Sequence, residues 1–210
     1  MNINSPKKVK ILILASGNGS NAENIINYFR DKFYHIDWRI ISNNSKAGVI
    51  EKSKKLNVPS LILNKDQFNS KSALIEIEKF NPSLIILAGF LLKISENLIE
   101  KFPNKIINIH PSLLPAYGGK GMYGMNVHNE VIKNLEKESG ITIHYVNKNY
   151  DEGKIIFQKK LTIQYPCSSK ELAKNIHDLE MKFFPKIIED LIKVFIANEI
   201  CLDNLIGKGT

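Results

Sequence analysis

Val9-Lys10-Ile11-Leu12-Ile13-Leu14-Ala15-Ser16-Gly17-Asn18-Gly19-Ser20-Asn21 is an apolar segment that runs directly into a glycine-rich one. Residues 9–15 predict a strand buried on both faces, because polar residues hardly interrupt them. Residues 16–21 predict a tight turn, and the amphipathic pattern that follows predicts a helix to about Arg30. A strand, a turn and a helix in this order form the first unit of an α/β fold.

The same strand–helix alternation continues through the first half of the chain. Further apolar strands are predicted at residues 38–42, 58–62, 84–88 and 105–109. The helices between them are predicted at residues 47–56, 71–80 and 95–102. Apolar strands separated by helices predict a doubly wound α/β domain, whose mostly parallel, Rossmann-like sheet is covered on both faces.

The second half of the chain has a different pattern. After a helix at residues 126–137, two strands at 141–146 and 154–163 predict an antiparallel hairpin at the sheet edge. The first of these strands alternates between apolar and polar residues and is expected to be half exposed. A long C-terminal helix is predicted from about residue 168 to 198, with a serine at its N-cap.

The composition is that of one globular domain. The chain is 43% hydrophobic and shows neither a membrane-spanning apolar run, nor a leader pattern, nor a linker. Residues 1–210 are therefore predicted to form a single domain with a flexible N-terminus at 1–7. Cys167 and Cys201 lie far apart and in no metal-ligand spacing. This cysteine usage predicts a reduced, cytoplasmic protein with no bound metal, and the lack of a long apolar run predicts no membrane partner.

The formal net charge of +8 raises the question of a nucleic-acid partner. The lysines are scattered along the chain, however, and only two arginines, Arg30 and Arg39, are present. No dense basic block with interleaved aromatic residues exists. Nucleic acid is therefore disfavoured, whereas a positive field favours an anionic small-molecule substrate.

Two polar side chains, Asn108 and His110, stand at the end of a predicted strand, in the segment N-I-H-P-S-L-L-P. Alternate residues of a strand point to the same face, so the two should project side by side. An amide and an imidazole together suit the stabilisation of an oxyanion while a proton moves. The alternative is a buried pair satisfied by hydrogen bonds. The catalytic interpretation is favoured because ligands bind at this edge of parallel sheets.

The loop that begins at Gly17 formally fits the dinucleotide pattern G-x-G-x-x-A. Backbone N–H groups at the helix N-terminus can hold a phosphate. A dinucleotide site also needs an acid at the end of the second strand, where this chain has Ser42-Asn43-Asn44. A site for one phosphate is therefore favoured over a dinucleotide site. A plain strand–helix turn with Ser20 as N-cap is the structural alternative.

A third candidate, Asp151, lies in the polar turn Tyr150-Asp151-Glu152-Gly153. Its simplest interpretation is ordinary hairpin chemistry, because Asp and Gly are turn formers. If the turn folds back over the sheet, the Asp151 carboxylate can pair with His110 and raise its pKa. His110 would then act as an acid or stabilise a developing oxyanion.

Four segments of the chain, in their order and spacing, resemble the phosphoribosylglycinamide formyltransferases, a folate-dependent family of purine synthesis within the formyltransferase superfamily. These segments are S-G-N-G-S-N at 16–21, L-A-G-F at 87–90, N-I-H-P-S-L-L-P at 108–115 and D-E-G at 151–153. The resemblance extends from about residue 8 to about residue 195. It implies the formyltransferase fold, with a nucleotide-binding half at 8–110 and a folate and catalytic half at 111–200.

The resemblance also implies an activity. A formyl group would pass directly from the co-substrate 10-formyltetrahydrofolate to the amine of glycinamide ribonucleotide, giving formylglycinamide ribonucleotide in de novo purine biosynthesis. Asn108 would hold the formyl oxygen, His110 would stabilise or protonate the oxyanion, and Asp151 would tune His110 and manage the proton through a water molecule. No metal is implied.

By position, the resemblance assigns Gly19, Ser20 and Asn21 to the nucleotide phosphate and Glu180 to the ribose hydroxyls. Without it, Glu180 is interpreted as part of a solvated helix face. The folate would be bound by Lys71, Leu91, Leu92, Lys93, Ile94, Asn108, Asn147, Tyr150 and Asp151. The family often has arginines at positions 71 and 92, so this folate site is expected to rely more on apolar and backbone contacts.

One segment departs from the bacterial members of the family, because residues 116–138 are longer and begin with a glycine-rich loop. This loop is expected to gate substrate entry, with His128 at the pocket rim. Two other functions stay open: a formyltetrahydrofolate deformylase-like hydrolase, which would use water in place of the amine, and a non-catalytic module that binds a nucleotide phosphate. The protein is expected to work as a monomer or a homodimer.

Overall fold

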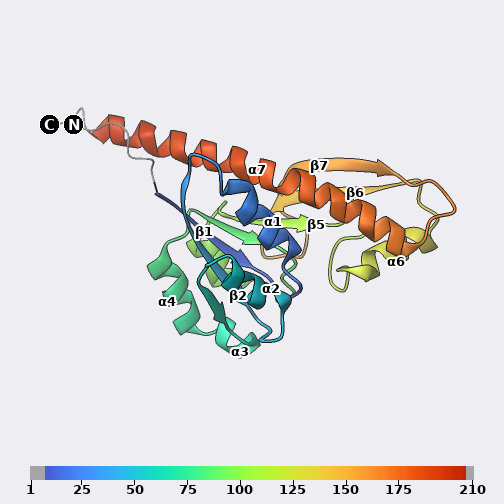
Figure 1. Ribbon diagram of the computed structural model, residues 1–210, viewed down its shortest axis with the longest axis horizontal. Helices are drawn as coiled ribbons and strands as arrows, with labels where there is room; N and C mark the ends of the chain where they lie inside the picture. The colour runs from blue at the N-terminus through green and yellow to red at the C-terminus, as the bar shows by residue number, and fades with distance from the viewer. Residues whose placement is uncertain (1–7, 207–210) are drawn as a thin grey trace.

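The computed structural model describes the backbone of residues 8–206 and the side chains of residues 8–197 (Figure 1). Seven strands form one sheet in the order β3-β2-β1-β4-β5-β6-β7. The strands are β1 (Lys8–Leu14), β2 (His35–Ser42), β3 (Ser60–Ile62), β4 (Leu84–Leu87), β5 (Ile106–His110), β6 (Glu138–Tyr145) and β7 (Ile155–Thr162). The first five pair in parallel and the last two antiparallel, so the predicted sheet with an antiparallel edge hairpin is confirmed. The predicted flexible segment 1–7 lies outside the described residues.

Helices cover both faces of the sheet. They are α1 (Ser20–Phe29), α2 (Gly48–Lys55), α3 (Lys65–Phe68), α4 (Lys71–Phe80), α5 (Glu96–Lys101), α6 (Met125–Lys133) and α7 (Ser169–Ile206). Alternate residues of β1 enter two separate cores, one beneath α1, α2, α6 and α7 and the other beneath α3, α4 and α5. Figure 1 shows α7 running along one side of the sheet, with α3 and α4 on the side away from it.

Local capping signals set several helix starts. Ser95 precedes α5, and its hydroxyl accepts the Leu98 N–H. Before α7, the Ser168 hydroxyl accepts the Glu171 N–H at 3.2 Å, while the Glu171 carboxylate accepts the Ser168 N–H at 2.7 Å. This reciprocal pair confirms the predicted start of the long helix. Among residues 8–206, no helix combines the length and the apolar content needed to cross a membrane.

The expectation that the first hairpin strand is half exposed is wrong, because β6 is buried along most of its length. It pairs with β5 on one side and β7 on the other. Its Thr142 hydroxyl donates to the Ser112 carbonyl and accepts the Leu114 N–H. Thr142 therefore faces a loop of the protein that satisfies its hydroxyl, rather than water.

The predicted helix at 126–137 is too long. Helix α6 ends at Lys133, Leu135 adopts a left-handed φ of 52°, and β6 begins at Glu138. The short α3 was not predicted. It is held by Asn64 and Gln67, whose side chains cap each other's backbone N–H groups, but four residues are too few to show a helical period.

A carboxylate, Glu189, ties α7 to the rest of the fold. It receives hydrogen bonds from Lys32 at 2.7 Å, from the Tyr28 hydroxyl at 2.6 Å and from the Tyr34 hydroxyl at 3.3 Å. Burial by itself raises the pKa of Glu189. The hydrogen bonds from Lys32 and Tyr28 outweigh burial and lower that pKa from 4.5 to about 2.

Glu189→Gln is expected to lower the free energy of unfolding at pH 7 by at most about 3 kcal/mol, because each unit of pKa corresponds to about 1.4 kcal/mol. Since the folded-state pKa is depressed, this stabilisation is complete above pH 4.5 and is lost as the pH falls towards 2. Urea unfolding at pH 7 and pH 3 measures both effects. Asp190→Asn, at the exposed neighbouring carboxylate, should change stability by less than about 0.5 kcal/mol. Equal losses of unfolding free energy in the two variants would show that the hydrogen bonds of Glu189 do not stabilise the fold.

Candidate active site

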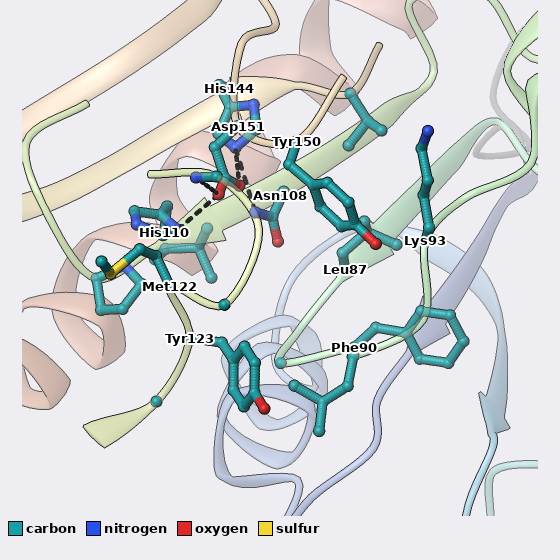
Figure 2. A pocket seen from close by; sticks show the side chains of 18 of the residues that line it. Leu87, Phe90, Lys93, Asn108, His110, Met122, Tyr123, His144, Tyr150 and Asp151 are labelled. Carbon is teal, nitrogen blue, oxygen red and sulfur yellow. Dashed lines mark hydrogen bonds and ion pairs between the residues drawn. The ribbon is translucent and has the colours of Figure 1, made fainter. Parts of the chain in front are cut away.

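A cavity of about 740 Å³ opens beyond the carboxyl ends of β4 and β5 (Figure 2). Its walls come from the segment after β4, the end of β5, the loop before α6, the turn between β6 and β7, and the first turns of α7. Its volume lies within the roughly 300–1,000 Å³ that is typical of ligand pockets. The cavity therefore occupies the sheet edge where the sequence predicts the site.

Strand β5 delivers Asn108 and His110 into this cavity. His110 ends the strand and is only 3% exposed. Its Nε2 donates to the Tyr117 backbone carbonyl at 2.8 Å, while its Nδ1 lies 3.5 Å from Oδ2 of Asp151. A carbonyl oxygen can only accept, so Nε2 carries the hydrogen, and in the neutral ring Nδ1 keeps its lone pair.

The turn between β6 and β7 brings Asp151 to the two β5 side chains (Figure 2). Its Oδ2 accepts the Gly119 N–H at 2.9 Å, and its Oδ1 lies 3.7 Å from Nε2 of His144. Gly153 allows the turn to pass against the Tyr145 backbone carbonyl, where a Cβ atom would overlap that oxygen. One carboxylate therefore stands between two imidazoles.

The electrostatic balance of this cluster differs from the one expected. Burial lowers the pKa of His110, and the Asp151 carboxylate and the Tyr117 carbonyl oppose this shift without reversing it. Asp151 thus acts to raise the pKa of His110, as expected, but desolvation is the larger effect and the pKa is lowered overall. Burial also opposes ionisation of Asp151. The neighbouring His144 and His110 and the Gly119 N–H outweigh it, so the pKa of Asp151 is lowered.

A second polar group lines the cavity at Glu180 on α7. Its Oε2 accepts from Asn21 Nδ2 at 2.8 Å and lies 3.4 Å from Nδ1 of His177. Hydrogen bonding to Glu180 raises the pKa of His177. The Oδ1 atom of Asn21 is buried and has no hydrogen-bond partner among the residues that the structure describes. The solvated helix face that the sequence alone favoured for Glu180 is therefore a cavity wall.

The glycine loop enters the cavity through Gly17 and Asn21, whereas Gly19 and Ser20 lie beside it without lining it. Gly19 is the N-cap of α1, so the alternative in which Ser20 caps this helix is wrong. Gly19 has a left-handed φ of 78°, and a Cβ atom there would overlap Val49. Glycine is required because the loop packs directly on α2.

Most of the residues that the resemblance assigns to the folate line the same cavity. They are Leu91, Leu92, Lys93, Ile94, Asn108, Asn147, Tyr150 and Asp151. Lys71 is the exception, because it begins α4 and borders a separate small hollow of about 50 Å³. Lys93 lies over the Tyr150 ring, with its Nζ 5.7 Å from the ring centroid.

Sequence reasoning left several cavity residues without a role. His144 is 2% exposed and lies opposite Asn108 in the register of β5 and β6. This register is set by pairing between distant segments, which the sequence does not show. The sequence signal for the position of His144 was the apolar–polar alternation of Ile141-Thr142-Ile143-His144. His128, expected at the rim, is 5% exposed, and burial lowers its pKa. The glycine-rich loop adds Lys120, Met122 and Tyr123 to the wall.

The cavity carries titratable groups but no arrangement typical of a metal centre. Across the part of the chain that the structure describes, no group of three or more His, Cys, Asp or Glu side chains is placed to hold a metal ion. Asp151 is instead flanked by His110 and His144. The geometry suits proton transfer and oxyanion stabilisation.

Known proteins share both the sequence pattern and the fold. The model of the family described as formyl transferase matches residues 9–188. The phosphoribosylglycinamide formyltransferase of Bacillus subtilis (strain 168) is 33% identical over 189 residues, covering 87% of this chain and 94% of that protein. The chloroplastic phosphoribosylglycinamide formyltransferase of Arabidopsis thaliana is 34% identical over 190 residues, but this chain spans only 65% of its length. The solved phosphoribosylglycinamide formyltransferase of Streptococcus pneumoniae TIGR4 has a TM-score of 0.77 at 28% identity, covering 88% of this chain and 99% of that one.

Proposed function

Because the chain belongs to the formyl transferase family, we propose that it transfers the formyl group of 10-formyltetrahydrofolate to the amine of glycinamide ribonucleotide. The product is formylglycinamide ribonucleotide, in de novo purine biosynthesis. The observation that carries the proposal is the convergence of Asn108, His110 and Asp151 in a cavity that also reaches Gly17 and Asn21 at the start of α1. Both a reaction centre and a place for a phosphorylated substrate are thereby available.

In the proposed reaction the substrate amine is the nucleophile. Its nitrogen bonds to the formyl carbon, and the carbonyl electrons move onto oxygen to give a tetrahedral oxyanion. Collapse of this intermediate breaks the bond between the formyl carbon and N10 of the folate, which takes up a proton. The protein forms no covalent bond, so its task is to orient the reactants and to manage charge and protons.

Asn108, His110 and Asp151 divide this task. The Asn108 amide donates an N–H to the oxyanion. His110 starts neutral because burial lowers its pKa, so its Nδ1 can take the proton that the amine loses. Asp151, 3.5 Å away, stabilises the imidazolium that forms. His110 can then return this proton to the departing folate nitrogen through a water molecule.

Other residues in the cavity wall or directly beside it bind the two substrates. The N–H groups at the start of α1, at Gly19, Ser20 and Asn21, are suited to the nucleotide phosphate. Glu180, held in place by Asn21, is suited to accept hydrogen bonds from the ribose hydroxyls. The folate would occupy the wall made by residues 91–94, Asn147 and Tyr150. Each proposed site therefore also uses residues from the other half of the chain. The nucleotide site includes Glu180, from the half at 111–200, and the folate site includes residues 91–94, from the half at 8–110.

Two other functions predict different behaviour in the same pocket. A deformylase-like hydrolase would place water where the amine is proposed, and would release formate without any nucleotide. A non-catalytic module would bind the nucleotide phosphate whether or not His110 is present. We also propose, from the cysteine usage, that the protein works in the cytoplasm. We propose separately that it is a monomer or a homodimer.

One assay tests the proposed function. Purified protein is mixed with glycinamide ribonucleotide and 10-formyltetrahydrofolate, and folate absorbance is followed over time. Formyl transfer is expected only when both substrates are present, and the formylated nucleotide should appear in equal amount to the deformylated folate. A folded sample that gives no turnover would contradict the proposal. Formate release without the nucleotide would favour the hydrolase.

A further inference from the structure

His144 is a cavity residue to which neither the motif nor the proposed reaction gives a role. It lies on β6 directly across from Asn108, and the two residues are register partners in the antiparallel pair. Its side chain is 2% exposed, so its polar atoms must find partners within the protein or in the cavity. Figure 2 shows it above Asn108 and Asp151, joined to both by dashed lines.

The hydrogen bonds of His144 define its tautomer. Its Nδ1 lies 2.8 Å from the Tyr145 backbone carbonyl, which can only accept, so Nδ1 carries the hydrogen. In the neutral ring Nε2 then offers a lone pair. Nδ2 of Asn108 lies 3.2 Å from this nitrogen and donates to it. Oδ1 of Asp151 is farther away, at 3.7 Å, so Asn108 is the nearer partner.

This contact decides which way the Asn108 amide faces. A flipped amide would point its oxygen at the Nε2 lone pair, and two acceptors would meet in a buried site. With the flip excluded, the amide keeps one N–H on His144 and has a second N–H to donate elsewhere. Figure 2 shows the Asn108 oxygen turned away from His144 and into the cavity.

We propose that His144 is a positioning residue, which holds the Asn108 amide in the single orientation that presents one N–H and the carbonyl oxygen to the reacting groups. The free N–H serves the oxyanion, and the carbonyl oxygen can accept a hydrogen from the attacking amine and so aim its lone pair. The roles in catalysis rest on the proposed function. The tautomer and the amide orientation do not, because they follow from contacts within the protein.

The first experiment needs no turnover. A long-range ¹H–¹⁵N spectrum of the wild-type protein should show the neutral His144 ring with its hydrogen on Nδ1 and none on Nε2. The side-chain amide protons of Asn108 should exchange slowly with solvent, and His144→Leu should speed that exchange by at least about 10-fold. A protonated Nε2 on a neutral ring, or unchanged amide exchange, would overturn the proposal even if the protein proved to have another function.

The second experiment uses a double-mutant cycle with formyl transfer as readout. His144→Leu is expected to lower kcat by about 10-fold while KM for each substrate changes less than about twofold. Because His144 acts through Asn108, the double variant that combines His144→Leu with Asn108→Ala should have nearly the same kcat as Asn108→Ala alone. His144→Gln, whose amide oxygen can accept the same N–H, should recover part of kcat. The exposed His35→Leu on β2 is the control. If the two substitutions lowered kcat independently, so that their fold-losses multiplied in the double variant, the proposal would be contradicted.

Discussion

In His110→Ala, kcat for formyl transfer is expected to fall by about 10³-fold, within the range of about 10²–10⁴ that a positioned acid–base group contributes. The variant removes the β5 imidazole whose Nδ1 lies 3.5 Å from Oδ2 of Asp151. Neither the phosphate end of the cavity nor the folate wall loses a side chain. The KM values should therefore change much less than kcat, as steady-state kinetics with each substrate will show.

His110→Gln controls for the structural part of this loss. Its amide can still donate to the Tyr117 carbonyl, which His110 holds at 2.8 Å, but it cannot carry a proton between substrates. Thermal unfolding should be close to wild type, and kcat should stay low. The exposed His35→Ala should leave kcat unchanged. A near-wild-type rate in His110→Gln would remove His110 from the proton pathway.

The pH profile follows from the same group. Burial lowers the pKa of His110 below its ordinary value of 6.5, so the neutral, proton-accepting form dominates at neutral pH. For wild type, kcat/KM should decline only as the pH falls below 6.5, where the imidazole gains a proton and no longer accepts one. This acid limb should be absent from the profile of His110→Gln.

Asp151→Asn is expected to lower kcat by about 10²-fold. The substitution keeps the shape of the side chain, and its amide oxygen can still accept the Gly119 N–H that Asp151 holds at 2.9 Å. What it removes is the negative charge beside His110, which stabilises the imidazolium formed during the reaction. Because Asp151 acts to raise the pKa of His110 against burial, the acid limb of the variant should move to still lower pH.

Glu152→Gln is the matched control for Asp151→Asn. Glu152 belongs to the same turn, but its exposed carboxylate accepts from Asn149 at 2.6 Å and does not line the cavity. The control should retain kcat within about twofold. If both variants lose activity equally, the turn as a whole, and not the charge on Asp151, would be responsible.

The sequence went far in fixing local structure, because its signals act over a few residues. The apolar run before Gly17 determines β1, and the Ser95 and Ser168 hydroxyls determine where α5 and α7 begin. The same local reasoning failed for α3, which is too short to show a period. It also failed for β6, which is buried between two other strands and whose Thr142 hydroxyl is satisfied by another part of the chain.

By itself, the sequence determined the fold class, the family and the three side chains at the centre of the proposed reaction, because strand alternation and a specific motif are legible along the chain. Only the tertiary structure decided what surrounds them. Pairing of β5 with β6 set His144 against Asn108, and packing of α7 on α1 brought Glu180 to Asn21. Burial, which depends on the whole fold, decided that the pKa of His110 falls although an acid lies beside it.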